Sequence, residues 1–362
     1  MTIVHCFGAG LVGSYVAVKL ADSGHLVHIY DIDGKNSKLK NHQNISFHKC
    51  DVFGFDLATL GSGGVFVNML PGEIGHALTS RLANEPGRRI VDLSFSEKTP
   101  DMGLENGIAT GTKVLWDVGI APGLSNMFLA VASRIIGELE TAEIRVGGNP
   151  IERDGEWDYM APFSPKDVIA EYTRPARVVR AGEVVILPAL SERHMLDIPE
   201  FGVMEAFLTD GLRSVIDSIP AKEMSEYTVR WPGHIERFIQ ERETGSLNID
   251  ELMNEWKFDP DAPEFTWLQV LATGRNHAMR WTVRDLGGDD GSSMARTTGL
   301  VTVGCIQAWI EHPDMLTDGV HPPEALPQEV VESVIGLMKS NGIDIQVISG
   351  TPFAVRDTIL DL

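Results

Sequence analysis

Cysteine, positive charge and long apolar runs are all scarce in this sequence of 362 residues. Its three cysteines, Cys6, Cys50 and Cys305, are far apart and offer neither a disulfide framework nor a CxxC motif for redox chemistry or zinc. We therefore expect a reducing compartment, the cytoplasm. No apolar run is long enough to span a bilayer, and the first predicted strand begins at Ile3, so we expect neither a membrane segment nor a signal peptide.

The deficit of basic residues limits the partners that we expect. With 51 acidic and 30 basic residues, the formal net charge is −21. Such a charge argues against binding to nucleic acid or to an anionic membrane surface. The histidines are scattered, and the sequence has no HExxH, GxSxG or GxxxxGK[ST] motif. We therefore expect no metal site, no serine-hydrolase elbow and no P-loop.

The N-terminal segment carries the strongest local motif. An apolar segment over residues 3–7 predicts a buried strand, and a helical pattern begins at residue 11. The turn between them reads Gly8-Ala9-Gly10-Leu11-Val12-Gly13. In a dinucleotide-binding turn, these three glycines permit the bend, the approach of a pyrophosphate and the close packing of the helix. The N–H groups at the helix start, at Leu11 and Val12, then face the phosphates. The alternative is a glycine turn in an unrelated α/β fold.

An acid after the second predicted strand indicates the cofactor. Asp31 follows the strand over residues 26–30, where a carboxylate can accept hydrogen bonds from both hydroxyls of the adenosine ribose. Asp33 adds negative charge nearby, and a 2′-phosphate would be repelled. Lysines at positions 35, 38 and 40 weaken this preference without reversing it. We therefore predict NAD and not NADP.

The first third of the chain alternates apolar strands with amphipathic helices, which predicts a doubly wound parallel sheet of the Rossmann type. Ligands bind beyond the carboxyl ends of such strands. Asp51 follows the third strand, where it could lie near the adenine or simply be a solvated acid. The other candidate cofactor contacts in strand-end segments are Asn68, Leu70, Pro71, Gly72, Asp117 and Gly119. Asn68, Pro71 and Gly72 could border the nicotinamide ribose or could only form a strand-to-helix turn.

The alternation stops after residue 122. From residue 143 onward strands are grouped together, with a hairpin over 266–284, and this pattern predicts an α+β domain with a mostly antiparallel sheet. A long apolar helix over 293–310 is expected to return to the first domain. We therefore predict a dinucleotide-binding domain over 1–122, a substrate and dimerisation domain over 123–290, and C-terminal helices over 291–362 that return to the Rossmann domain.

Several longer motifs allow the sequence to be placed. They are the glycine turn, Asp117 to Asn126, Val146 to Pro150, Phe163 to Asp167, Glu171 to Ala176, Arg230 to His234, Met294 to Gly299 and Gly319 to Glu324. Together they resemble the saccharopine dehydrogenase-like family, and within it most the L-lysine 6-dehydrogenase branch. The resemblance implies a Rossmann domain interrupted by a substrate domain, usually in a homodimer. It also implies NAD-dependent oxidation of the ε-amino carbon of L-lysine, which gives ammonia and a semialdehyde that cyclises to piperideine-6-carboxylate.

Such chemistry requires a base near neutrality, because the amine must be neutral before a hydride leaves. Asp117 could be that base, hold the ammonium, orient the carboxamide of the cofactor, or only cap a helix. His234 could be a base or a structural hydrogen-bond donor. No settled acid–base assignment follows from the resemblance.

A carboxylate of the substrate would call for an arginine. We favour Arg213, which follows a polar stretch, over Arg177, Arg180 and Arg230. Tyr159 and Glu192 are further polar candidates. Trp231, Trp267 and Trp281 are expected to pack in the core, although one of them could form a wall of the substrate pocket.

Three functions remain open at this point. The first is the L-lysine dehydrogenase. The second is a saccharopine-type or carboxynorspermidine-type reductase that forms a secondary amine and needs more charged ligands. The third is an NAD-binding sensor or scaffold without turnover.

Overall fold

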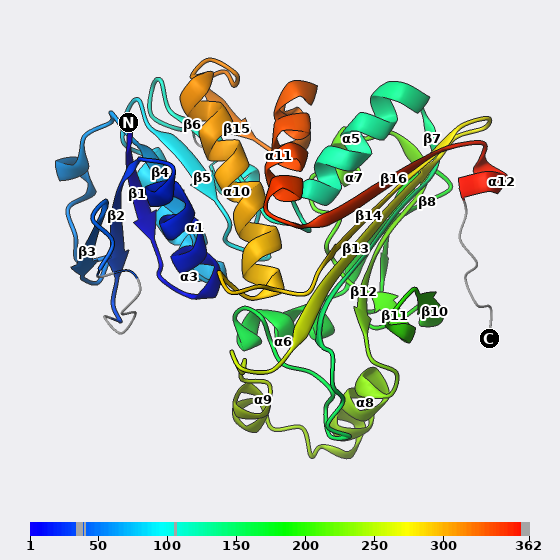
Figure 1. Ribbon diagram of the computed structural model, residues 1–362. Coiled ribbons are helices and arrows are strands. Elements are labelled where there is room, and N and C mark those ends of the chain that lie inside the picture. Colours follow the sequence, from blue (N-terminus) through cyan, green and yellow to red (C-terminus); the bar gives the residue numbers. More distant parts are fainter. Residues whose placement is uncertain (34–38, 40, 105–106, 356–362) are drawn as a thin grey trace. The chain divides into compact units, whose positions relative to one another are not determined.

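The computed structural model describes residues 1–33, 39, 41–104 and 107–355 (Figure 1). The chain forms two compact units. The first comprises residues 1–124 and 295–341, and the second comprises residues 125–294 with the described residues from 342 onward. The lysines at positions 35, 38 and 40, which bear on the choice between NAD and NADP, lie outside the described residues.

A parallel sheet forms the centre of the first unit and confirms the predicted Rossmann arrangement. Its strand order is β15-β6-β5-β4-β1-β2-β3, and every neighbouring pair is parallel. The strands are β1 (Ile3–Phe7), β2 (Leu26–Asp31), β3 (Ile45–Lys49), β4 (Val65–Asn68), β5 (Arg89–Asp92), β6 (Lys113–Leu115) and β15 (Gly319–His321). The order reverses beside β1, which is the switch point where doubly wound sheets bind ligands.

Helices surround this sheet. They are α1 (Leu11–Asp22), α3 (Gly72–Ala83), α4 (Pro100–Gly103), α10 (Ser293–Glu311, in this unit from Ala295) and α11 (Gln328–Ser340), with 3₁₀ helices η1 (Leu57–Leu60) and η2 (Pro323–Ala325). Leu78 and Leu82 of α3 share a buried core with Phe7 and Phe66 of the sheet. Helix α10 packs closely on α1, since a Cβ at Gly299 would lie 2.5 Å from the ring of Tyr15. The long apolar helix thus packs in the first unit.

The second unit is built on a mixed sheet in which most neighbours are antiparallel. The order is β10-β11-β12-β7-β13-β14-β16, with β8 pairing with β12 and β9, and only β7 and β12 run parallel among the described pairs. The strands are β7 (Leu139–Pro150), β8 (Ala176–Arg180), β9 (Glu183–Leu187), β10 (His194–Ile198), β11 (Gly202–Leu208), β12 (Ala221–Arg230), β13 (Glu264–Thr273), β14 (Ala278–Asp285) and β16 (Asp344–Gly350). This confirms the predicted second sheet.

The end of the chain differs from the expectation. Strand β16 pairs with β14, beside the predicted hairpin of β13 and β14 (Figure 1). The expectation that all of 291–362 returns to the first unit is therefore wrong, because the segment after α11 adds a strand to the second sheet. Ile345 of β16 is buried opposite Val283, and this contact accounts for the pairing at the start of the strand.

The helices of the second unit are α5 (Leu124–Ile136, in this unit from Ser125), α6 (Pro165–Thr173), α7 (Val215–Ser218), α8 (His234–Thr244), α9 (Ile249–Glu255) and α12 (Pro352–Val355). Residues of α6, α8 and α9 share a core with Phe207 of β11. Phe207 lies opposite Thr228 of β12, so Glu226, Thr228 and Arg230 point to the same side, which we call the helix face. Arg145 and Gln269 belong to the other side, the opposite face. Within the described ranges, no helix is both long enough and apolar enough to cross a membrane.

Candidate functional site

In the glycine turn between β1 and α1, the first and third glycines are packed against backbone atoms, whereas the space beside the second glycine is free. Gly8 has φ +100°, and a Cβ there would lie 2.9 Å from the carbonyl oxygen of Met69. A Cβ at Gly13 would lie 2.3 Å from the carbonyl oxygen of Gly8, whereas a Cβ at Gly10 would meet nothing within 4 Å. The turn therefore has the free space that a pyrophosphate requires at Gly10.

Helix α1 begins at this open position. Gly10 is its N-cap, and among the described residues no side chain caps the helix. The N–H groups of Leu11 and Val12 belong to the first turn, whose N–H groups have no acceptor within a helix. Together with the helix dipole, they form a site suited to an anion.

Asp31 is fixed at the edge of the same turn. Its Oδ2 accepts a hydrogen bond from the Ala9 N–H at 2.6 Å, and its Oδ1 accepts one from the Asp33 N–H at 2.6 Å. A carboxylate oxygen can accept more than one bond, so both oxygens can still receive hydroxyl groups. The exposed Asp51 follows β3, and its Oδ1 accepts the Phe53 N–H at 2.9 Å, which closes a local turn. The geometry of Asp31 suits a ribose diol, whereas the bond of Asp51 is that of a turn residue.

Asn68 has a structural role in the turn between β4 and α3. It is fully buried, and its Nδ2 lies within hydrogen-bond distance of Gly75 O (2.7 Å), Thr79 Oγ1 (2.9 Å) and Asp92 Oδ1 (3.2 Å). Its Oδ1 accepts the Leu70 N–H at 3.2 Å. Because these bonds all point into the protein, Asn68 does not suit the role of a ribose ligand that its position suggested.

Part of the same turn remains accessible, although Gly72 is buried. Leu70 is half-buried, Pro71 is exposed and is the N-cap of α3, and Gly72 is the first residue of that helix. Among the described residues no side chain caps α3. These three positions stay candidates for a cofactor contact through the backbone.

Asp92, at the end of β5, is a buried acid that the sequence analysis did not select. Its Oδ1 accepts the N–H of Ser94 (2.7 Å) and the hydroxyl of Ser94 (2.6 Å), whereas Oδ2 has no partner among the described residues. Burial raises the pKa of Asp92 to about 6, and the charge of Asp117 acts in the same direction, against the bonds from Ser94. Two acids therefore lie close to each other in this part of the first unit.

Asp117 follows β6 in a strained backbone conformation. It is buried and has φ +54°, a left-handed conformation that costs on the order of 1–3 kcal/mol outside glycine. The residues after it are held tightly. The Gly119 N–H donates to Pro122 O at 3.1 Å, and Val118 O accepts the hydroxyl of Thr302 from α10 at 2.7 Å. A rigid loop thus presents Asp117 and Gly119.

A second cluster lies on the helix face of the second unit, around Arg230. This buried guanidinium donates from Nε to the Tyr172 hydroxyl (2.9 Å), from Nη2 to the Tyr159 hydroxyl (3.3 Å) and from Nη1 to Val229 O (3.0 Å). It also lies 4.4 Å from the centre of the Tyr159 ring. Burial opposes its charge, but Tyr159, Tyr172 and Glu171 together raise the pKa of Arg230, so it is always a cation here.

His234 belongs to the same network, and its hydrogen bonds do not suit a general base. Its Nδ1 lies 2.9 Å from Trp157 O, so this nitrogen carries the proton, and its Nε2 accepts from the Tyr172 hydroxyl at 3.1 Å. Burial, and then the charge of Arg230, lower the pKa of His234 to about 3. Because both ring nitrogens are occupied and the ring is buried, we assign His234 a role in orienting Tyr172.

Two glutamates of the helix face, of which Glu171 lies near Arg230, were missed by the sequence analysis. Glu171, on α6, is half-buried and has no hydrogen-bond partner among the described residues, and burial raises its pKa to about 7 although Arg230 and Arg174 lower it. Glu226, on β12, is buried and accepts the hydroxyl of Thr209 at 2.5 Å. Burial raises the pKa of Glu226 to about 8, and Glu171 and Asp210 add to this. Two carboxyl groups whose pKa values are near neutral pH can bind an ammonium group and accept a proton from it.

One sequence signal could have revealed Glu226. Glu226, Thr228 and Arg230 are spaced by two residues, as polar side chains on one face of a strand are. In contrast, Glu171 is one acid among many on amphipathic helices. Only the burial of Glu171 and its nearness to the charge of Arg230 in the fold distinguish it.

Two of the arginines that we considered as carboxylate ligands have acidic partners. Arg177 is paired with Asp210 through two bonds of 3.0 Å, and Arg180 is paired with Glu192 at 2.6 Å. Their charges are thereby balanced. Arg213 is 2% exposed and has φ +56°. A strained backbone conformation of this kind is common at functional sites.

The remaining aromatic candidates pack in the core. Trp231 donates to Pro150 O at 2.8 Å, and Trp281 stacks on Phe128 with ring centres 5.1 Å apart. Trp267 is buried on the opposite face of the sheet. Over the part of the chain that the structure describes, no group of three or more histidine, cysteine, aspartate or glutamate residues could hold a metal ion.

Comparisons with known proteins agree with this architecture. Residues 119–343 match the model of the saccharopine dehydrogenase C-terminal domain. The fold is similar to that of an apo saccharopine dehydrogenase (L-Glu forming) from Saccharomyces cerevisiae, with a TM-score of 0.72 and 14% identity over 96% of this chain and 100% of that chain. It is also similar to a homospermidine synthase from Legionella pneumophila in complex with NAD, with a TM-score of 0.65 and 14% identity over 96% of this chain and 91% of that chain. At such identities the likeness shows the fold alone.

Proposed function

This chain belongs to the saccharopine dehydrogenase C-terminal domain family, and on that premise we propose that it is an NAD-dependent oxidoreductase that acts on an amine or amino acid. The observation that carries the proposal is the pair of acids Glu171 and Glu226. Glu171 and Glu226 lie on the helix face with pKa values near neutrality, as the deprotonation of an amine requires. The family assignment and the open glycine turn support the same class of reaction.

The first unit fits NAD at the residues that the motif predicts. The turn of Gly8, Gly10 and Gly13, with the N–H groups of α1, would hold the pyrophosphate, and Asp31 would hold the ribose. When bound, NAD supplies the hydride acceptor. The rigid loop with Asp117 and Gly119 would contact the nicotinamide portion. The carboxylate of Asp117 would orient the carboxamide of the cofactor.

In the proposed reaction, L-lysine loses a hydride from its ε-carbon and a proton from its ε-nitrogen. Glu171 first accepts a proton from the ε-ammonium group, because only the neutral amine can release a hydride. When the hydride leaves the ε-carbon of this neutral amine, a protonated imine remains, which takes up water and releases ammonia and a proton. The product is the semialdehyde that cyclises to piperideine-6-carboxylate. Arg213 would bind the α-carboxylate of the substrate, and Glu226 would bind its α-ammonium group.

The acid pair also favours a second candidate, the formation or cleavage of a secondary amine, as in saccharopine or carboxynorspermidine. Such a compound presents more charged groups than lysine does, and Glu171 is close enough to Arg230 and to Glu226 for their charges to interact. The saccharopine-type reaction uses the same hydride chemistry. It differs in the group attached to the amine nitrogen.

A substrate panel tests these candidates. The purified protein is incubated with NAD and with L-lysine, saccharopine, ornithine or a polyamine at alkaline pH, and the absorbance of NADH is followed. Reduction with L-lysine is the expected result. Reduction with saccharopine or a polyamine instead would select the second candidate. NAD binding without reduction by any compound would contradict both and favour a sensor or scaffold.

A further inference from the structure

The loop over residues 209–213, which follows β11, lies against the side chain of Glu226 on the helix face. The Thr209 hydroxyl donates to Glu226 Oε2 at 2.5 Å, and the Thr209 N–H donates to Glu226 O at 3.2 Å. The hydroxyl of Thr228 lies 2.8 Å from that of Thr209. When Glu226 is ionised it takes the single proton of Thr209, so Thr228 donates to Thr209. Two hydroxyl groups in series therefore hold one oxygen of this carboxylate.

Gly211 of the same loop provides the space in which this carboxyl group lies. A Cβ at Gly211 would lie 2.5 Å from Glu226 Cδ, 2.5 Å from Oε2 and 2.9 Å from Oε1, and these are its three nearest atoms. Gly211 does not have a positive φ, so its backbone can carry an L side chain. A methyl group at this position would therefore collide with the carboxyl group of Glu226.

The loop is fixed by Asp210, between Thr209 and Gly211. Asp210 Oδ1 accepts the N–H and the Nε of Arg177, each at 3.0 Å, and Oδ2 accepts Nη2 of Arg177 at 3.0 Å. Such a bidentate pair with an added backbone bond holds the loop in place. The side chain of Glu226, rather than the loop, would therefore move away from a methyl group at Gly211.

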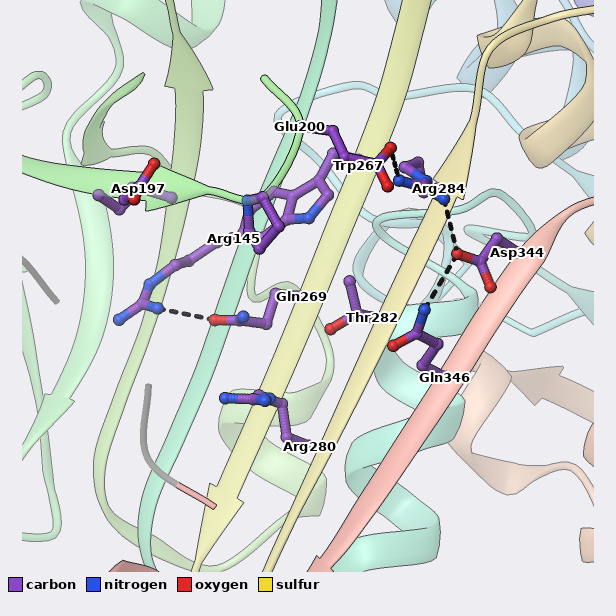
Figure 2. A pocket seen from close by; sticks show the side chains of 12 residues that line it. Arg145, Asp197, Glu200, Trp267, Gln269, Arg280, Thr282, Arg284, Asp344 and Gln346 are labelled. Carbon is purple, nitrogen blue, oxygen red and sulfur yellow. Dashed lines mark hydrogen bonds and ion pairs between the residues drawn. The ribbon is translucent and has the colours of Figure 1, made fainter. Parts of the chain in front are cut away.

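Glu226 has no cation to balance its charge. It is 4% exposed and has no ion pair among the described residues, and the nearby charged groups that act on it, Glu171 and Asp210, are acids. On the opposite face of the sheet, in contrast, Asp344 is paired with Arg284 at 3.1 Å (Figure 2). A buried carboxylate costs free energy unless it is paired. A cationic group of a ligand would supply the pair that Glu226 lacks.

We propose that Gly211 is a positioning residue that sets substrate specificity, because the space beside it lets Glu226 bind a second ammonium group of the substrate. Compounds with two amino groups are then preferred over monoamines of the same length. This inference rests on the proposed function, in which Glu171 takes the reacting amine. L-Lysine has both amino groups, whereas 6-aminohexanoate is the same chain without the α-ammonium group. The two compounds together isolate the contact at Glu226.

Variants of the loop are compared with matched controls. Gly211→Ala adds the methyl group, and Gly336→Ala on α11 is its control, because a Cβ there would meet nothing within 4 Å. Thr209→Val removes the hydroxyl donor, and Thr209→Ser keeps it. Glu226→Gln removes the charge itself. Combining Gly211→Ala with Glu226→Gln shows whether Gly211 acts through Glu226.

NADH formation at alkaline pH gives KM and kcat for both compounds, and calorimetric titration of the protein saturated with NADH gives their affinities without turnover. We expect the wild type to bind L-lysine about tenfold or more tightly than 6-aminohexanoate. In Gly211→Ala, Thr209→Val and Glu226→Gln, KM for L-lysine should rise about tenfold or more while kcat changes little. KM for 6-aminohexanoate should stay unchanged in these variants.

The controls Gly336→Ala and Thr209→Ser should behave as the wild type. The combined variant should bind L-lysine as Glu226→Gln alone does, because Gly211 has no further effect once the charge is gone. A combined variant that binds L-lysine about tenfold more weakly than Glu226→Gln would contradict this positioning role.

Failure of this inference can be told apart from failure of the proposed function. If the wild type binds L-lysine with these losses in the variants but forms no NADH, the proposed reaction is wrong and the role of Gly211 is supported. If the wild type oxidises L-lysine and Gly211→Ala leaves KM unchanged, the role of Gly211 is overturned. Equal binding of the two compounds by the wild type, or no binding of L-lysine, also overturns it. If Gly211→Ala does not fold, the result for Thr209→Val decides.

Discussion

Among single residues, Glu171 has the central role in the proposed reaction, that of the general base. Replacing it by Gln keeps the size of the side chain and removes the proton acceptor, so we expect kcat to fall by about 10²–10⁴-fold. Since burial raises the pKa of this carboxyl to about 7, the base form predominates only above that pH. Wild-type amine oxidation should therefore increase as the pH rises through about 7.

The pH profile of kcat at saturating substrate distinguishes a base from a merely structural glutamate. In Glu171→Gln, kcat should no longer increase as the pH rises through about 7, while the affinity for NAD stays unchanged. A variant with a lower kcat that still increases through pH 7 would exclude Glu171 as the base.

Asp92 gives a prediction about stability. Its pKa is 3.8 in the unfolded chain and about 6 in the fold, so the native protein binds the proton more tightly. The contribution of Asp92 to the free energy of unfolding is highest below pH 4 and declines as the pH rises to about 6. At about 1.4 kcal/mol per pKa unit, the change is on the order of 2–3 kcal/mol. Asp92→Asn should lack this dependence.

Thermal midpoints of the wild type and Asp92→Asn, measured at pH 4 and at pH 7, check this sign. The midpoint of the variant should increase relative to that of the wild type between the two pH values. An equal difference at both would show that Asp92 is ionised in the fold as readily as in water.

At the residue level, the sequence predicted the cofactor turn better than the acid pair. Gly8, Gly10, Gly13 and Asp31 stand at fixed spacings within one βαβ unit, so local pattern suffices. In contrast, Glu171 and Glu226 come from a helix and a distant strand, and their pKa values depend on burial. The same dependence on burial makes His234 a neutral, hydrogen-bonded group.

Among secondary-structure elements, the turn before α1 offers a matched pair of variants. Ala at position 13 would place a Cβ 2.3 Å from Gly8 O, whereas Ala at position 10 would meet nothing within 4 Å and fits φ −66°. We expect Gly13→Ala to lower the thermal midpoint. Gly10→Ala should leave the midpoint unchanged but weaken NAD binding, because its Cβ would occupy the space of the pyrophosphate.

Thermal melting and NAD titration of both variants give the result directly. If Gly10→Ala binds NAD as tightly as the wild type, the pyrophosphate does not lie over Gly10.

The helices and strands could be predicted where the apolar pattern of the sequence is long and lies within one segment. The alternating strands and helices of the first unit and the β13–β14 hairpin have clear apolar periodicity. Strand β15 is short, Gly319–His321, and is fixed only by its pairing with β6. Strand β16 likewise acquires its place from β14, far away in sequence, and no local pattern indicates which sheet a C-terminal strand will join.

For the whole molecule, we propose a homodimer. Strand β9 is at an edge of the second sheet, and its Val184 and Ile186 side chains are 51% and 69% exposed. Exposed apolar side chains on an edge strand are typical of an interface. Light scattering coupled to size exclusion should give twice the mass of 39.6 kDa. Val184→Lys combined with Ile186→Lys should reduce the mass to that of one chain, and an unchanged mass would place the interface elsewhere.

The central claim is that a hydride moves from the ε-carbon of L-lysine to NAD. The most direct measurement supplies L-lysine that carries deuterium on that carbon and determines the mass of the NADH formed. We predict NADH that contains one deuterium, together with release of ammonia. Unlabelled NADH, or no NADH from L-lysine while NAD still binds, would contradict the proposed reaction.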